Sequence, residues 1–244
     1  MIDDFDDGSP KARGQQSERA YAHVRTALLN RRFRAGELLP VPMIASELNM
    51  SRQPVLQALR RLATENMVEI IPQVGCRVAS HSLEQIADFY RLFAVVEGLA
   101  MSLAAERCTE RQLRRLRAIA DEIDMLVRAT ATEYERASGY RALNREFHAA
   151  IHQMAGAPEI ALLSQSHWDR SELYIVNASD SLLFSDRLET AHAEHLELIE
   201  ALAGRNAEAA GKMMSSHVAG FGADVVSRLA GQVARAGEPQ PLHA

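Results

Sequence analysis

The sequence lacks the features of secreted, redox-active and membrane-spanning proteins. Only two cysteines occur in 244 residues, Cys76 and Cys108, and their wide separation fits neither a metal-binding nor a redox motif. No run of eighteen apolar residues is present, which excludes a transmembrane helix. Four aspartates stand among the first seven residues, where a secretory signal would be basic and then apolar. We therefore expect a cytoplasmic protein with reduced thiols and no membrane partner.

Aromatic residues are also scarce, while Ala, Leu, Arg and Glu are abundant, and this balance favours helices over sheet. A length of 244 residues favours two domains. The net charge of −5 is unevenly spread: residues 17–80 carry nine arginines against five acidic groups, a net +4, whereas residues 81–244 carry sixteen basic and twenty-three acidic groups, a net −7. A basic segment on an acidic body indicates that one end of the chain meets a polyanion.

The N-terminal segment is predicted to form a disordered tail followed by a helix. Residues 1–16 hold Gly and Pro among charges without apolar periodicity, which is typical of disorder. Ser17 can cap a helix, and Tyr21, Val24 and Leu28 then fall on one face. We expect this helix to end near Arg32.

Two short helices and a hairpin are expected next. Pro42 opens the first helix, and the second runs from about Ser51, a good N-cap, to Glu65. A tight turn joins the two helices, and this pattern predicts a helix-turn-helix. Two β-prone runs follow, Val68–Ile71 and Cys76–Ala79. The four residues between them predict a β-hairpin wing in which Gly75 adopts positive φ.

The remainder of the chain shows one amphipathic helical pattern after another, joined by short links. Six such helices predict an antiparallel bundle. The expected fold is therefore mainly α, with a winged helix-turn-helix over residues 17–80 followed by an antiparallel all-helical bundle of six or seven helices over residues 81–230. Residues 231–244 are expected to be a flexible tail. The predicted bundle helices span about 82–107, 109–127, 132–154, 158–176, 185–202 and 205–229.

Three histidines and one asparagine form the strongest chemical pattern inside the predicted bundle. Asn144 and His148 are four residues apart and share a helix face. His195 and His217 lie on the last two helices, at similar depth on either side of Gly204. Three neutral imidazoles and one oxygen ligand suit a divalent metal such as Zn or Ni. The spacing alone leaves open that these are ordinary core histidines.

One run in the N-terminal segment resembles a known family. It reads Ser51-Arg52-Gln53-Pro54-Val55-Leu56-Gln57-Ala58-Leu59-Arg60-Arg61-Leu62. With the preceding helices and the Gly-tipped hairpin, residues 17–80 resemble the GntR regulators. The resemblance implies a homodimeric transcriptional regulator that binds a palindromic or pseudo-palindromic double-stranded DNA operator.

The resemblance also implies which residues contact DNA. Arg52 would be the reader on the recognition helix, with Gly75 and Arg77 in the wing. The sequence departs from the family at Leu56 and Leu38, where arginines are usual, so other side chains must supply part of the readout. The candidate DNA-binding residues are Ser51, Arg52, Gln53, Gln57, Gly75 and Arg77.

The C-terminal pattern resembles the FadR-type branch of that family, whose helical ligand-binding domain is called FCD. The segments that carry the likeness are Asn144-Arg145-Glu146-Phe147-His148, Glu194-His195, and Met214 with His217. The resemblance implies a small-molecule effector and four metal ligands: Asn144, His148, His195 and His217. The family usually has Asp where Asn144 stands, and an amide brings no charge.

The effector site also departs from the family. Phe93 stands where an arginine often binds an acidic effector, which weakens the inference of an organic acid. Arg91 and Arg141 are candidate replacements. A less polar effector held by aromatic side chains is the other possibility. The candidate pocket residues are Phe93, Glu97, Phe147, Trp168 and Tyr174.

Two alternatives remain open beside the metal-assisted regulator. The same regulator could bind an organic ligand in a metal-free pocket. A helical metalloenzyme would need a general base, but Glu146 points roughly 160° away from His148 around the helix and no His-Glu-x-x-His motif is present. We therefore expect no enzymatic activity. The sequence leaves open the effector, the operator and the direction of regulation.

Overall fold

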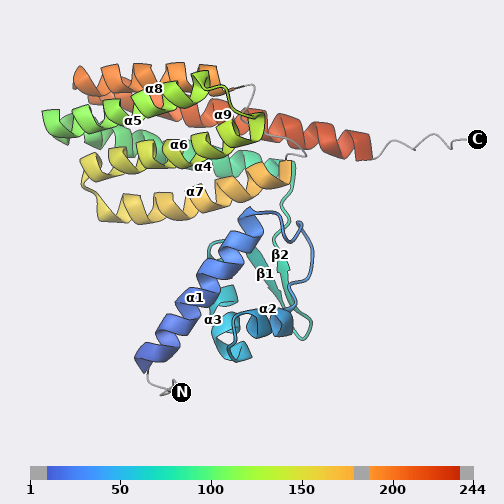
Figure 1. Cartoon of the computed structure of the whole chain (residues 1–244). Coiled ribbons are helices and arrows are strands. Elements are labelled where there is room, and N and C mark those ends of the chain that lie inside the picture. The colour runs from blue at the N-terminus through green and yellow to red at the C-terminus, as the bar shows by residue number, and fades with distance from the viewer. Residues whose placement is uncertain (1–9, 179–186, 237–244) are drawn as a thin grey trace, which may run out of the picture. The chain divides into compact units, whose positions relative to one another are not determined.

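The computed structural model of the chain describes residues 10–178 and 187–236, in two compact units (Figure 1). The first unit holds the chain up to His81 together with Arg170–Asn177, and the second holds Ser82–Asp169 with the residues from Ala178 onward. Among the described residues, no helix combines the length and apolar character needed to cross a membrane.

The first unit contains three helices and one hairpin: α1 (Pro10–Leu29), α2 (Val41–Glu47), α3 (Arg52–Thr64), β1 (Val68–Ile71) and β2 (Gly75–Val78). Apolar side chains from all of these elements form one core, because each helix turns an apolar face inward. The predicted winged helix-turn-helix is confirmed. Fully buried members of the core include Val24, Leu28, Val55, Leu59, Leu62 and Val78.

Helix α1 begins at Pro10, so the prediction of a helix that starts at Ser17 after a tail over residues 1–16 was wrong for residues 10–16. Proline suits the first helical turn because its fixed φ is already helical and its missing N–H would have no partner there. Ser17 therefore lies inside the helix and caps nothing. Residues 1–9 of the predicted tail lie outside the described residues.

The turn between α2 and α3 places Ser51 at the N-cap, as predicted. Asn49 adopts φ 51°, a left-handed conformation that asparagine tolerates. Ser51 has extended backbone with φ −69° and ψ 165°, but its side chain makes no capping hydrogen bond. The predicted position of the helix start is thus confirmed, and the predicted capping bond was wrong.

The hairpin pairs β1 and β2 in antiparallel register, with Glu69 opposite Arg77. Gly75 has φ 139°, which confirms the expected positive φ, and Gln73 in the same turn has φ 63°. A third extended segment, which was not predicted, pairs with β2: residues 36–39 hydrogen bond to it, and Leu38 forms a bridge to Arg77. A segment of four residues shows too little alternation to be recognised as a strand.

Six helices form a bundle in the described part of the chain, as predicted (Figure 1), and they belong to the second unit except for Arg170–Asn177 near the end of α7. Ser82, Thr109 and Thr132 begin three of them with capping boxes, and Gly156 ends the helix that Thr132 begins, in a left-handed conformation. The helices are α4 (Leu83–Arg107), α5 (Glu110–Arg128), α6 (Glu133–Ala155), α7 (Pro158–Ala178), α8 (Leu188–Ala203) and α9 (Ala207–Ala236).

Helix α9 is longer than predicted, because it continues to Ala236 instead of ending near Leu229. The predicted flexible tail over residues 231–244 was therefore wrong for residues 231–236, where Gln, Val, Arg and Ala sustain the helix despite Gly231. Residues 237–244 of that tail lie outside the described residues. So does the start of the predicted helix over 185–202.

Helices α4 and α9 approach each other closely along four small residues, Gly98, Ser102, Gly211 and Ser215, which we call the α4–α9 seam. A Cβ atom at Gly98 would overlap the hydroxyl of Ser215 and lie 2.9 Å from the carbonyl oxygen of Gly211. Each serine hydroxyl donates to a backbone carbonyl of the opposite helix, at 2.8 and 2.9 Å. The seam therefore fixes how these two helices lie against each other.

The seam predicts opposite effects for two glycine substitutions on α9. Gly211→Ala should lower the free energy of unfolding by about 1–3 kcal/mol, because the added methyl group meets Ser102 and a carbonyl oxygen of α4. Gly220→Ala, with no atom within 4 Å of the added Cβ, should raise it by about 0.5–1 kcal/mol. Urea denaturation of both variants measures the difference, and equal stabilities would contradict the close packing.

Candidate metal centre

Three histidines from three helices converge in the interior of the bundle. His148 lies on α6, His195 on α8 and His217 on α9, and one ring nitrogen from each lies within 4.8 Å of the others. Their ring centroids are 5.1 to 5.7 Å apart. The structure thus brings together three of the four predicted ligands. The similar depth expected for His195 and His217 explains why they meet.

Several ring nitrogens of this cluster are buried without a partner. Within the described part of the chain, Nε2 of His148 and both ring nitrogens of His195 have no hydrogen-bond partner, and both residues are fully buried. A buried polar atom left unsatisfied costs about 1–3 kcal/mol, so native proteins rarely retain one without a reason. Lone pairs that converge within 4.8 Å fit a divalent cation, which satisfies all of them at once.

Two of the three imidazoles donate a hydrogen bond to a carboxylate. Nδ1 of His148 donates to Oε2 of Glu97 at 3.1 Å, and Nδ1 of His217 donates to Oε2 of Glu194 at 2.5 Å. These bonds place the proton on Nδ1 and leave the lone pair of Nε2 for a metal. A carboxylate, an imidazole and a metal in sequence is the usual arrangement of a histidine ligand.

Burial favours the neutral form of His148 and His195, which is the form that a metal ligand needs. It lowers the pKa of His148 to about 4, although the hydrogen bond and charge of Glu97 act to raise it. Burial likewise holds the pKa of His195 well below its usual range. Burial alone would raise the pKa of Glu97, but hydrogen bonds from His148 and His152 outweigh it and hold that pKa well below its usual value. The carboxylate is therefore ionised at neutral pH.

Asn144 lies on α6 one turn before His148, and its side chain is nearly buried, with 8% exposed. Residues four apart on a helix share a face. Its amide oxygen is accordingly the fourth candidate ligand from the sequence. Glu146 is half-exposed and pairs with Arg115 at 3.5 Å, so it is not placed to act as a general base at the histidine cluster.

Three of the predicted aromatic pocket residues lie around the histidines. Phe147 stacks on His195 with centroids 4.3 Å apart, Trp168 lies 4.5 Å from His148, and Phe93 meets Trp168 at 5.3 Å. These rings close the cluster off from water and lower its effective dielectric constant.

Tyr174, another predicted pocket residue, lies within Arg170–Asn177 of the first compact unit. There its hydroxyl accepts a hydrogen bond from Arg170 at 2.6 Å, and its ring centroid lies 5.2 Å from that of His81.

A groove of about 380 Å³ opens beside the histidine cluster, between α6 and α7. Trp168 and His152 belong both to its wall and to the surroundings of His148. Arg145, which was not predicted as a pocket residue, lies in this wall and pairs with Asp169 at 2.6 Å. Arg91, suggested from the sequence as a replacement for the arginine that the family often has where Phe93 stands, is exposed and pairs with Asp88. The lining residues are Arg145, Ala149, His152, Gln153, Ala161, Gln165 and Trp168.

The side chains predicted to contact DNA lie on the surface of the first unit. Arg52, Gln53 and Gln57 are exposed on α3, with Ser51 exposed at its N-cap. Ser51, Arg52 and Gln53 are consecutive and Gln57 follows one helical turn later, so side chains near the start of one helix can enter a major groove together.

In the hairpin, Gly75 is exposed at the tip, whereas Arg77 donates to Glu69 across the strands at 2.8 Å. Arg61, further along α3, stacks on the ring of Tyr21 at 3.7 Å and pairs with Glu18. Arg61 is therefore engaged within the protein, whereas Arg52 is exposed at the start of the same helix.

Comparison with known families agrees with this division of the chain. Residues 88–220 match the family described as "FCD domain", which covers the histidine cluster and the groove. Residues 16–78 match the family described as "Bacterial regulatory proteins, gntR family", which covers α3 and the hairpin.

Individual proteins show the same similarity over most of their length. The transcriptional repressor GlaR of Escherichia coli is 24% identical over 81% of this chain and 90% of its own, and the Nta operon transcriptional regulator of Aminobacter aminovorans is 25% identical over 76% and 83%. Among solved structures, E. coli McbR/YncC has a TM-score of 0.67 at 19% identity, covering 89% of this chain and 98% of its own. A GntR regulator of Rhodococcus sp. RHA1 has a TM-score of 0.67 at 23% identity, covering 87% and 98%. These structures show a shared fold.

Proposed function

The chain belongs to the FCD-domain branch of the GntR family of DNA-binding transcriptional regulators, and from that premise we propose that its histidine cluster holds a divalent metal as part of the effector site. The unpartnered nitrogens of His148 and His195 are the observation that carries the proposal. His148, His195 and His217 would be the ligands, with Asn144 as the fourth. An imidazole-rich set suits Zn or Ni. When bound, the metal would supply a positive centre for an electron-rich group of the effector.

We infer that the groove between α6 and α7 admits the effector. Its wall combines the ring of Trp168 with the polar side chains of Arg145, Gln153 and Gln165. A small molecule with an apolar body and one polar or acidic end, such as an organic acid, fits this lining. Such an effector controls operator affinity only through its different affinities for the DNA-binding and non-binding states.

DNA recognition is assigned to α3 and the hairpin. Arg52, Gln53 and Gln57 would read base edges in the major groove, Ser51 would contact the backbone, and the wing with Gly75 would approach the minor groove. Arg77 would have to exchange its partner Glu69 for a phosphate. These assignments apply in the cytoplasm, where the chromosomal operator is.

The metal and the DNA can be tested together on the full-length protein. Metal analysis of the purified protein should find about one equivalent of Zn or Ni per chain, and none in His148→Ala. Gel shifts across the DNA upstream of its own gene should show specific binding that changes when a chelator removes the metal. Specific binding by a protein that takes up no metal would instead support the metal-free pocket.

A homodimer follows from the proposed palindromic operator, and an apolar stripe on α4 is its candidate contact surface. Leu92, Val95 and Leu99 are 53%, 65% and 50% exposed and lie on one side of the helix. Two antiparallel copies of α4 centred on Val95 would bring Leu92 of one copy against Leu99 of the other. A stripe that is complementary to itself in this way suits a two-fold interface.

Val95→Glu should therefore convert the dimer to a monomer of 27.0 kDa, because it buries a charge in that interface. Light scattering coupled to size-exclusion chromatography measures the mass. The matched control is Met125→Glu on α5, where an equally exposed apolar side chain lies away from the stripe. A Val95→Glu protein that stays dimeric would exclude this face.

A further inference from the structure

The proposed ligand set leaves a divalent cation without a negatively charged ligand. Three neutral imidazoles and the amide of Asn144 donate lone pairs but no charge. We propose that Glu97 is a positioning residue. It is not itself a ligand, and it supplies the missing negative charge through its hydrogen bond with His148. The inference rests on the proposed function, because it concerns the same metal site.

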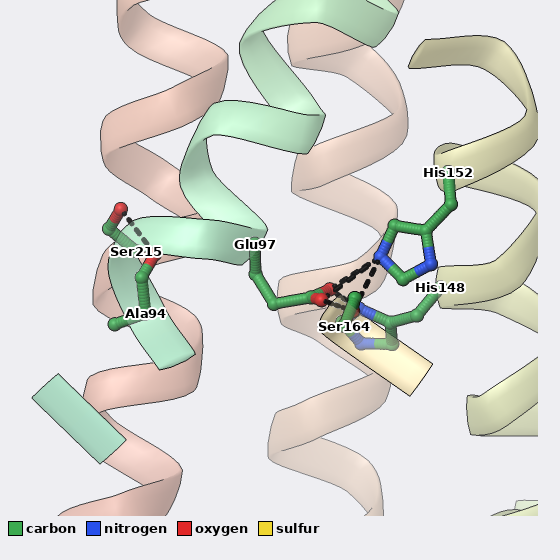
Figure 2. A network of polar contacts seen from close by, with 6 residues as sticks. All are labelled: Ala94, Glu97, His148, His152, Ser164 and Ser215. Carbon is green, nitrogen blue, oxygen red and sulfur yellow. Dashed lines mark hydrogen bonds and ion pairs between the residues drawn. The ribbon is translucent and has the colours of Figure 1, made fainter. Parts of the chain in front are cut away.

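The contacts of Glu97 saturate its carboxylate with donors (Figure 2). The side chain is 1% exposed. Oε2 accepts from Nδ1 of His148 at 3.1 Å, Oε1 accepts from Nε2 of His152 at 2.9 Å, and the hydroxyl of Ser164 donates to Oε1. A carboxylate held by three donors is ionised and fixed. It lies on the far side of the His148 ring from Nε2, so it acts on a metal through the ring and not as a ligand.

The charge of Glu97 is not neutralised by a basic side chain. Its ion-pair partners in the described part of the chain are the imidazoles of His148 and His152, with no guanidinium or ammonium group among them. The carboxylate behind His217 differs, because Glu194 also pairs with Arg187 at 3.3 Å. Of the two carboxylates that hold the candidate ligands, Glu97 therefore keeps the negative charge that a buried cation would attract.

The backbone around Glu97 is held as firmly as its side chain. The next residue, Gly98, is part of the α4–α9 seam, and Ser215 of α9 donates to the carbonyl oxygen of Ala94, one turn before Glu97, at 2.9 Å (Figure 2). The seam fixes the backbone that carries Glu97, and the hydrogen bonds from His148, His152 and Ser164 hold its carboxylate. A fixed distance from the cluster is what a charge acting through His148 requires.

The test is a double-mutant cycle on the zinc affinity of the full-length protein, measured by competition with a chromophoric chelator. Glu97→Gln keeps an acceptor for His148 and removes the charge, and should lower the affinity for Zn²⁺ about 10- to 100-fold. Asn144→Asp places a charge among the ligands, and should restore most of that loss in the double variant. Asn144→Asp should raise the affinity more in the Glu97→Gln background than in wild type, so the two effects should be non-additive. Glu106→Gln, at an exposed position on the same helix, is the control and should change nothing.

Two further readouts separate charge from folding. The visible spectrum of bound Co²⁺ reports the ligand set, and should be the same for wild type and Glu97→Gln, because the ligands are unchanged. Nitrogen NMR of the metal-free protein should show the Nδ1–H tautomer of His148 in both, because the amide oxygen of glutamine also accepts a hydrogen bond from Nδ1–H. A changed spectrum or tautomer would mean that Glu97→Gln alters the ligand arrangement and does not only remove a negative charge, and would overturn the inference.

The outcomes distinguish this inference from the metal proposal itself. If wild type binds Zn²⁺ and Glu97→Gln binds it equally well, Glu97 supplies no charge and the inference fails alone. The inference fails in the same way if Glu97→Gln weakens binding and Asn144→Asp does not recover it. If wild type takes up no Zn²⁺, the proposed metal site fails and the inference fails with it.

Discussion

Replacing His195 by leucine is expected to weaken metal binding by about 100- to 1,000-fold and yet leave the metal-free protein at least as stable as wild type. His195 is fully buried, and neither of its ring nitrogens has a hydrogen-bond partner. A histidine retained for stability would have hydrogen-bond partners, since an unsatisfied buried polar group costs about 1–3 kcal/mol. A histidine retained as a metal ligand would keep its ring nitrogen without a protein partner, as His195 does.

The size of each effect follows from the two roles. Four-ligand zinc sites provide roughly 10–16 kcal/mol, so losing one ligand should weaken Zn²⁺ binding by about 100- to 1,000-fold. In the metal-free protein, leucine fills a similar volume beside Phe147 without polar atoms, and the free energy of unfolding should rise by about 1 kcal/mol. Zinc should raise the melting temperature of wild type but not of the variant.

A second buried histidine provides the matched control. His167 is 9% exposed, donates from Nδ1 to the carbonyl oxygen of Leu163 at 2.7 Å, and stacks on Phe89 and Phe93. His167→Leu should lower the stability by about 1 kcal/mol and leave zinc binding unchanged. Calorimetric titration and thermal unfolding of both variants measure the contrast. If His195→Leu destabilises the metal-free protein as much as His167→Leu does, His195 is an ordinary core residue.

Replacing Arg52 by alanine is expected to lower the affinity for the operator by about 10- to 100-fold, with a smaller change in affinity for random DNA. A bidentate contact of arginine with a guanine is worth about 1–3 kcal/mol of discrimination between bases. This chain should depend on Arg52 strongly, because two other arginines usual in the family are Leu56 and Leu38 here. Leu56 is half-buried and Leu38 forms part of the sheet edge, so neither position offers a replacement.

Arg61→Ala is the matched control on the same helix. Arg61 stacks on Tyr21 and pairs with Glu18, so its removal should leave the preference for the operator intact. Fluorescence anisotropy with operator and scrambled duplexes at equal salt gives both affinities. Losing a base contact lowers the ratio of the two, whereas losing a phosphate contact lowers both affinities together. An unchanged ratio in Arg52→Ala would contradict the assigned role.

Periodicity predicted most of the fold because each helix here buries one continuous apolar face. The bundle helices, the helix-turn-helix and the hairpin all follow from patterns within about twenty residues. The missed sheet edge is different in kind, because residues 36–39 are ordered only by pairing with β2, far along the chain. The start of α1 was missed because charges and glycine resembled a disordered tail, although Pro10 suits a first helical turn.

The metal ligands could be predicted because their positions along the helices follow from counting residues. The residues that surround them could not, because those contacts join helices that are distant in the sequence. Counting from Gly204 places His195 and His217 at one level, and the structure brings them together with His148. The partnership of Glu97 with His148 crosses from α4 to α6, so no local pattern reveals it. The wall residue Arg145 did leave a signal, since it is seven residues before His152 and shares its helix face.

The central claim is that α3 reads a two-fold symmetric DNA sequence, and selection of binding sites from random duplexes tests it most directly. The full-length protein should enrich one palindromic or pseudo-palindromic sequence with two half-sites spaced by about one helical turn. Arg52→Ala should enrich a degenerate version of it at the positions that arginine reads. Recovery of no shared sequence from wild type, over repeated rounds at moderate salt, would contradict the account.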